Sequence, residues 1–139
     1  MQNFELSHFD DFLTIARQQA EPQTLLLVLA QRELPEGHTR EQARLFEAGQ
    51  GGHLAPVAGV DKRLEDLNSF EDFVTESDQL VQNWDAVFVA ALAGTNKQAP
   101  GAESTDEALE KMLQGIRSGM IHNYLVFDRA GEPLILNEA

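Results

Sequence analysis

Apolar residues in this chain gather in short runs separated by polar segments. The runs Thr24–Ala30 (TLLLVLA) and Ala86–Ala93 (AVFVAALA) are apolar without alternation. That pattern is typical of strands buried on both faces, so we expect these two strands to be central and adjacent. Leu54–Val60 (LAPVAGV) predicts a third strand. Pro56 within it cannot donate a ladder hydrogen bond, which favours the edge of the sheet.

Helical spacing of apolar residues marks four further segments, each of which begins with a capping residue. The expected caps are Ser7, Thr39 with Gln42, Ser69, and Ser104 with Glu107. Near the end of the chain, NYLVFDRAGEPLIL predicts two short strands joined by a turn at Arg129–Gly131.

The predicted order of elements is αβαβαβαββ. Strands separated by helices favour right-handed crossovers, so we expect an α/β fold with a mostly parallel five-stranded sheet. Helices would pack on this sheet, its strand order would be 2-1-3-4-5, and the C-terminal hairpin would add an antiparallel edge. The alternative is a two-layer α+β sheet. A length of 139 residues predicts a single domain, 1–139.

Composition narrows the possible functions. The chain carries 23 acidic and 10 basic residues, a net charge of -13, which disfavours binding to nucleic acid. It has no cysteine, which excludes disulfides, thiolate metal sites and cysteine nucleophiles. The longest apolar run, Leu25–Ala30, is far shorter than the roughly 20 residues of a membrane span. The N-terminus shows no signal peptide, so we expect a cytoplasmic protein with no membrane contact.

The run Gly49-Gln50-Gly51-Gly52 raises the question of a phosphate loop. Such loops open a helix, whose N-terminus attracts the anion, whereas this run follows the predicted helix that ends near Ala48. We therefore interpret the glycines as a helix stop and a turn. His53 beside them has no marked nucleophile, which leaves a general-base role without a partner.

No metal site is marked in the sequence. The histidines are His8, His38, His53 and His122, and none has the i+3 or i+4 spacing of a zinc motif. Asp72 with Glu76 and Asp106 with Glu110 lie one helical turn apart. Their helices already have an apolar face, so we expect these acids on the solvated side. We expect no metal and no cofactor.

Strand topology points to one candidate site. Ligands of open parallel sheets sit beyond the carboxyl ends of the strands, where the strand order reverses. In the predicted fold this crevice lies between the loops 31–38 and 94–103. Arg32 and Lys97 there would hold a carboxylate or a phosphate; the alternative is a pair of ordinary polar loops. The candidate ligand-binding residues are Gln31, Arg32, Glu33, Thr95, Asn96 and Lys97. Trp84 is expected to be a core anchor.

Four stretches of the chain, FEAGQGG, PVAGVDK, WDAVFVAALAG and FDRAGEPL, are similar to parts of a known family. Together they resemble a family of small proteobacterial proteins that often carry the label "ribonucleotide reductase subunit alpha". The resemblance covers most of the chain and implies no site residues. The chemistry of that subunit requires a cysteinyl radical and a cysteine pair. A chain without cysteine therefore cannot perform it, and the label leaves only an accessory role.

Three functional hypotheses follow. The first is a non-catalytic accessory or regulatory module that binds a protein partner or a small ligand, because no catalytic constellation is marked. The second is a small enzyme, or a nucleotide- or anion-binding module, that uses the Arg32/Lys97 crevice. The third is a structural homo-oligomer that pairs through the terminal hairpin or an exposed helix face.

Overall fold

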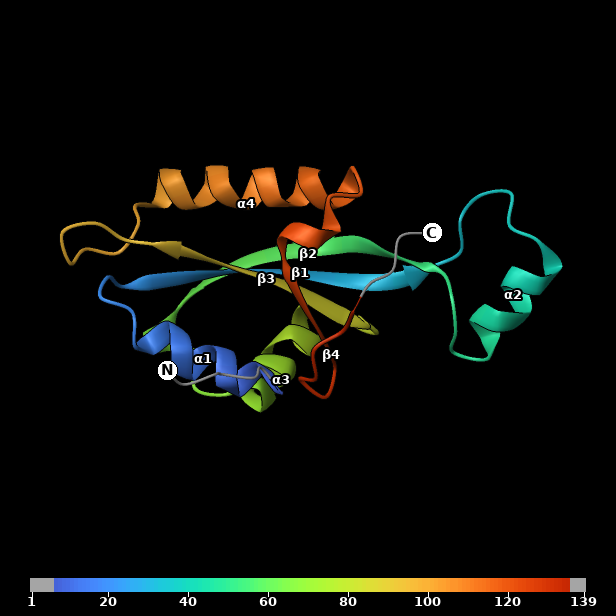
Figure 1. Cartoon of the computed structure of the whole chain (residues 1–139), viewed down its shortest axis with the longest axis horizontal. Coiled ribbons are helices and arrows are strands. Elements are labelled where there is room, and N and C mark those ends of the chain that lie inside the picture. The colour runs from blue at the N-terminus through green and yellow to red at the C-terminus, as the bar shows by residue number, and fades with distance from the viewer. Residues whose placement is uncertain (1–6, 136–139) are drawn as a thin grey trace, which may run out of the picture.

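The computed structural model describes residues 7–135 and shows a twisted sheet with helices on both faces (Figure 1). The strands are β1 Gln23–Glu33, β2 His53–Arg63, β3 Ala86–Ala93 and β4 Leu125–Asp128. The α-helices are α1 Phe9–Arg17, α2 Arg40–Glu47, α3 Phe70–Leu80 and α4 Ala102–Arg117, with short 3-10 helices η1 Leu64–Asp66 and η2 Ile121–Asn123. No helix in the described range is both long and apolar enough to cross a membrane.

The sheet has the order β2-β1-β3-β4, and every neighbouring pair is antiparallel. The fold is therefore α+β, and the predicted α/β fold with a mostly parallel five-stranded sheet is wrong. Strands 2, 1, 3 and 4 are neighbours in the predicted order, but their directions differ from the prediction. The physical reason is visible in Figure 1: α2 projects beyond the end of the sheet, so the connection that contains it acts as a long hairpin.

Two separate apolar clusters cover the two faces of the sheet. Alternate residues of β1 point to opposite sides, so that Leu25, Leu27 and Leu29 face one cluster while Leu26 and Val28 face the other. Helices α1 and α3 complete the first cluster, and α4 completes the second (Figure 1). Burial of β1 on both faces is confirmed. Of the two-layer α+β alternative, the α+β class is confirmed and the two layers are wrong, because helices cover both faces of the sheet.

Two of the four predicted helix N-caps are confirmed. Thr39 and Gln42 form the predicted capping box of α2, and Ser69 caps α3 as predicted. The other two caps differ from the prediction: the His8 side chain, not Ser7, accepts from the Asp10 N–H at the start of α1, and α4 begins after Gly101 rather than at Ser104.

The glycine run after α2 is a helix stop, as predicted. Gly49 has a φ of +84°, and its N–H donates to the carbonyl of Phe46 at 3.0 Å. The N–H of Gln50 donates to the carbonyl of Leu45 at 2.7 Å, which completes the usual left-handed helix ending. The run presents carbonyl-rich backbone at a helix C-terminus, where the dipole disfavours an anion.

The two edges of the sheet differ. Strand β2 is an edge strand, as Pro56 predicts, and an irregularity in the register places Val57 opposite no residue of β1. Strand β4 pairs only with Ala86–Val89, the first half of β3. Of the predicted terminal hairpin, β4 and the turn form, and Phe127 bridges to Pro133. A second strand does not form within the described residues, and Leu136 lies outside them.

Candidate functional site

The six predicted site residues do not form one crevice. In the register of β1 and β3, Gln23 lies opposite Ala93 and Ala30 lies opposite Ala86. The loop after β3 is therefore next to the start of β1, while Gln31, Arg32 and Glu33 occupy the far end of β1. The crevice required parallel strands, whose carboxyl ends meet at one edge, and the antiparallel pairing separates its two halves. Ligand binding by these residues stays a prediction.

Arg32 makes contacts that hold α2 to the sheet. Its guanidinium lies 4.4 Å above the ring of Phe46, and Nη2 donates to the carbonyl of Gly51 at 3.0 Å. Its backbone N–H donates to the carboxylate of Asp85 at 2.7 Å. These partners all belong to the chain itself, so Arg32 positions the α2 connection.

The neighbours of Arg32 have similar roles. The Gln31 amide donates to the carbonyl of Gln82 at 3.1 Å, and Glu33 lies 3.4 Å from the His53 ring at the start of β2. Both contacts link β1 to an adjoining segment.

Thr95, Asn96 and Lys97 lie in a tight turn. The backbones of Thr95 and Gln98 exchange both hydrogen bonds, at 3.0 and 2.9 Å. Asn96 and Lys97 between them have φ values of 53° and 64°, as a two-residue I′ turn requires. A Cβ on Gly94 would lie 1.9 Å from the carbonyl oxygen of Gln98, so only glycine fits there. The turn fixes the direction in which Lys97 leaves the backbone.

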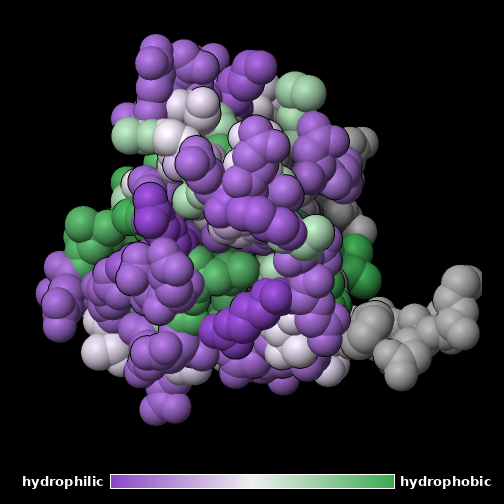
Figure 2. Space-filling model, turned by 90° about the vertical axis from the view of Figure 1, so that its left-hand side faces the viewer, coloured by the Kyte–Doolittle hydropathy of each residue, from purple (hydrophilic) through white to green (hydrophobic). Residues whose placement is uncertain are grey.

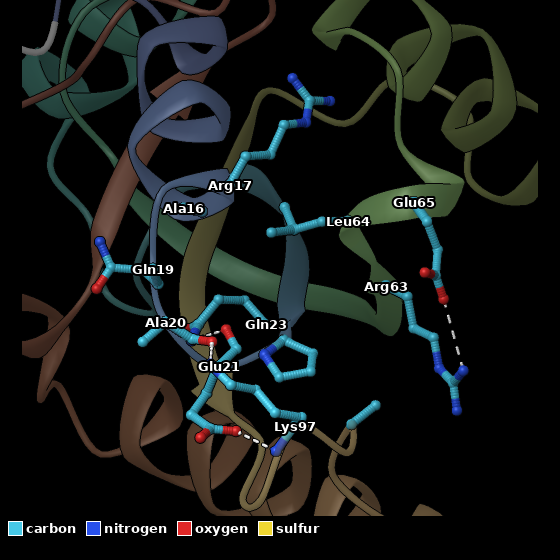
Figure 3. A pocket seen from close by; sticks show the side chains of 12 residues that line it. Ala16, Arg17, Gln19, Ala20, Glu21, Gln23, Arg63, Leu64, Glu65 and Lys97 are labelled. Atoms are coloured by element: carbon cyan, nitrogen blue, oxygen red, sulfur yellow. Dashed lines mark hydrogen bonds and ion pairs between the residues drawn. The ribbon is translucent and has the colours of Figure 1, made fainter.

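Lys97 extends back to the connection between α1 and β1 (Figure 3). Its Nζ donates to the carbonyl of Ala20 at 2.7 Å, and its backbone N–H donates to the carboxylate of Glu21 at 2.8 Å. Lys97 therefore forms part of a different site from the predicted one.

That site is an open depression of about 430 Å³ between the C-terminal end of α1, the end of β2 and the Lys97 turn. We call it the basic depression. Its lining residues are Ala16, Arg17, Gln19, Ala20, Glu21, Pro22, Gln23, Arg63, Leu64, Glu65, Lys97 and Ala99. Figure 2 views this end of the molecule, where the mostly hydrophilic surface is interrupted by a recessed apolar area.

Two of the cations at the depression are held by carbonyl oxygens. Arg17 donates from Nη2 to the carbonyl of Leu67 at 2.7 Å, and Lys97 donates from Nζ to that of Ala20. A carbonyl partner orients a cation without neutralising its charge. These two side chains therefore keep a full positive charge for an approaching anion.

Arg63 is the third cation, and it is loosely held. Its Nη1 lies 3.5 Å from the carboxylate of Glu65, and the Arg63 side chain is 56% exposed. In Figure 3 the side chains of Arg17 and Arg63 lie on different sides of Leu64 and point outward from it. An exposed ion pair of this length is worth about 0–1 kcal/mol, so Arg63 is free to exchange partners.

The charge at the depression differs from that of the whole chain. Three of the ten basic residues line it, against two carboxylates, in a protein whose net charge is -13. Sequence reasoning missed this site because Arg17, Arg63 and Lys97 come from three distant segments. The antiparallel order brings these segments together, because the start of β1 and the ends of β2 and β3 lie at one end of the sheet.

A second, polar depression lies where α3 meets β3 and the turn after β4. Arg129 pairs with Asp78 and lies 4.6 Å above the ring of the fully buried Trp84. The Arg129 guanidinium holds the pKa of Asp78 below its usual value, and Asp78 raises the pKa of Arg129 in return. The indole N–H of Trp84 further lowers the pKa of Asp78, although its geometry falls short of a hydrogen bond. Asp78 and Arg129 therefore neutralise each other, which indicates that the pair stabilises the contact between α3 and the turn after β4.

No candidate metal site is found among residues 7–135. No group of three or more histidine, aspartate or glutamate side chains converges there to hold an ion. Asp72, Asp106 and Glu110 are exposed, as expected, and Glu76 pairs with Lys62 of β2.

We compared the chain with protein-family models, with curated proteins and with solved structures. None of the three comparisons finds a match.

Proposed function

We propose that this protein is a non-catalytic accessory module that recognises an anionic group through the basic depression. The observation that carries the proposal is that Arg17, Arg63 and Lys97 line one depression, together with apolar side chains, in a strongly acidic chain. Two of these cations keep their charge because carbonyl oxygens hold them. Local positive charge in a chain of net negative charge favours the approach of an anion to this depression.

Binding is favoured over catalysis by what lines the depression. The site offers cations, two carboxylates and apolar side chains, with no histidine, serine or threonine among its lining residues. The enzyme or nucleotide-binding alternative relied on Arg32 and Lys97 acting together, and these residues lie at opposite ends of the sheet. The proposal keeps two expectations from the sequence: a cytoplasmic location, and an accessory role of the kind that the family resemblance implies.

A thermal-shift panel tests the proposal. The purified protein is heated with nucleotides, sugar phosphates, organic carboxylates and divalent cations, each at millimolar concentration. We expect at least one class of anion to raise the melting temperature and the cations to leave it unchanged. The Lys97→Ala variant should lose part of the shift, because it removes one of the three positive charges at the depression.

The matched control is Arg44→Ala, which removes an exposed arginine on α2 that pairs with Glu41. It should keep the full shift. If no anion stabilises the protein, or if Lys97→Ala responds as the wild type does, the depression is not the binding site. Light scattering on the same samples tests the homo-oligomer alternative, for which a monomer at high concentration is the contradicting result.

A further inference from the structure

We propose that the ligand of the basic depression is an organic carboxylate with an apolar body, and that Arg63 is the residue that closes on its carboxylate. This inference rests on the proposed function and specifies the chemistry of the ligand. It is carried by three features: the donors present at the site, the apolar residues that line it, and the weak pairing of Arg63 with Glu65.

The donors at the depression favour a planar monoanion over phosphate. Phosphate sites usually combine a helix N-terminus with backbone N–H groups of a glycine-rich loop. Here the adjoining helix end is the C-terminus of α1, whose free carbonyls disfavour a dianion more than a monoanion. The backbone N–H of Lys97 is already taken by Glu21. The free donors are guanidinium groups, whose planar fork matches a carboxylate.

The floor of the depression requires an apolar body on the ligand. Four apolar residues line the depression together with the cations: Ala16, Pro22, Leu64 and Ala99. Leu64 stands near the centre of the site, between Arg17 and Arg63 (Figure 3). A ligand without carbon atoms would leave this surface in contact with water, whereas an aromatic ring or a short alkyl chain would cover it. The volume of about 430 Å³ accommodates such a group.

Arg63 is the cation with freedom to move. Its partner Glu65 follows two residues later on the same surface, and the pair is long and exposed. A ligand carboxylate has only to replace Glu65 as the partner of Arg63, while the guanidinium turns toward Leu64. Glu65 therefore competes with the ligand, and removing its charge should strengthen binding.

The experiment is isothermal titration calorimetry at pH 7.5 in 150 mM sodium chloride, where screening limits repulsion from distant acids to about 8 Å. Four probes are titrated into the full chain. Benzoate carries the charge and the apolar body, acetate only the charge, benzyl alcohol only the body, and inorganic phosphate the other anion class. We expect benzoate to bind at least about tenfold more tightly than the other three, because only benzoate uses both the floor and the guanidinium.

Two variants with exposed, conservative changes identify the residues. Arg63→Gln should weaken benzoate binding about three- to tenfold, and Glu65→Gln should strengthen it about two- to fivefold. Arg44→Gln, on α2, should change nothing. Opposite effects at neighbouring residues cannot come from a general loss of folding.

The outcomes separate the inference from the proposed function. If phosphate binds as tightly as benzoate and Lys97→Ala weakens both, anion binding stands and the organic carboxylate is overturned. If benzyl alcohol equals benzoate, or if no probe binds, both proposals fail. If Glu65→Gln weakens benzoate binding or leaves it unchanged, the exchange of partners at Arg63 is wrong.

Discussion

Both oxygens of the Asp78 carboxylate accept from Arg129, at 3.0 Å from Nη1 and 2.8 Å from Nη2. Asp78 belongs to the end of α3, and Arg129 belongs to the turn after β4. The same guanidinium lies over the ring of Trp84 and donates to its carbonyl at 3.2 Å. One side chain therefore joins a helix, the start of a central strand and the C-terminal turn.

Replacing Arg129 with lysine should destabilise the protein although the charge is kept. Lysine cannot make the two parallel hydrogen bonds or lie flat on the indole. We expect a melting temperature lower by a few degrees, with Arg44→Lys unchanged as the control. Trp84 is the sole tryptophan, so its fluorescence during urea unfolding reports this region directly. Equal urea midpoints for Arg129→Lys and Arg44→Lys would contradict this stabilising role of Arg129.

The same pair predicts a dependence of stability on pH. Arg129 lowers the pKa of Asp78 in the folded state, so the unfolded chain binds this proton more readily. The resulting stabilisation is present above the ordinary aspartate pKa of 3.8, and it is lost as the pH falls through the lower folded value. Asp78→Asn should therefore be less stable than the wild type at pH 7, with the difference shrinking below pH 3.8.

Urea unfolding at pH 7, 5, 4 and 3 measures this difference. Asp61→Asn, at an exposed aspartate of β2, is the control and should follow the wild type more closely. A difference between Asp78→Asn and the wild type that is constant from pH 7 to pH 3 would contradict the argument.

The close approach of Gly131 to the His8 ring gives a steric prediction. The His8 ring lies 2.9 Å from the carbonyl of Ala130 through Nε2, and a Cβ on Gly131 would lie 2.4 Å from that nitrogen. Gly131 also has a φ of +82°. Gly119 has a similar φ of +86°, but a Cβ there would meet nothing within 4 Å. Comparing the two alanine variants therefore separates backbone strain from the clash with His8.

Gly119→Ala should cost about 1–2 kcal/mol, the usual penalty of a left-handed conformation. Gly131→Ala should cost about 1–3 kcal/mol more, because His8 must move and α1 loses its cap. In a His8→Ala background the extra cost should disappear, since the space is then open. Denaturant unfolding of the single and double variants measures these differences, and equal costs at the two glycines would show that His8 yields freely.

Arg32→Ala tests what one of the two predicted anion-binding cations does. Its contacts with Phe46 and Gly51 hold α2, which has no buried residue of its own. We expect the amides of α2 to exchange with solvent faster in the variant while the strands keep their protection. Unchanged exchange in α2 would show that Arg32 does not position it. Glu41→Ala, which leaves Arg32 in place, is the control.

Local signals in the sequence predicted the elements better than their arrangement. The runs around Leu27 and Val89 revealed the central strands because burial on both faces leaves a composition without alternation. Thr39 and Ser69 revealed helix starts because capping depends on residues three positions apart. His8 was missed because its ring caps α1 only where Ala130, far along the chain, accepts from its other nitrogen.

The relative direction of neighbouring strands was the feature that the sequence analysis predicted wrongly. A helix between two strands is compatible with either direction, and only the path of the connection decides between them. The predicted crevice depended on this direction, because Arg32 and Lys97 lie close together only if β1 and β3 are parallel. Lys97 was nonetheless a lining residue of a depression. Its companions Arg17 and Arg63 carry no local signal, since they meet only through the antiparallel register.

The second half of β3 gives a final prediction about the sheet edge. Gly94 donates its N–H to Pro22 at 2.8 Å, and backbone groups alternate along a strand, so the even-numbered residues of β3 face β1. The N–H groups of Ala91 and Ala93 therefore face the other side, where β4 has already ended.

The amides of Ala91 and Ala93 should exchange with solvent far faster than those of Ala90 and Leu92, and faster than that of Val89, which β4 covers. Amide exchange followed by NMR measures the five residues in one sample. Equal protection of all five would mean that another segment pairs with this edge in solution.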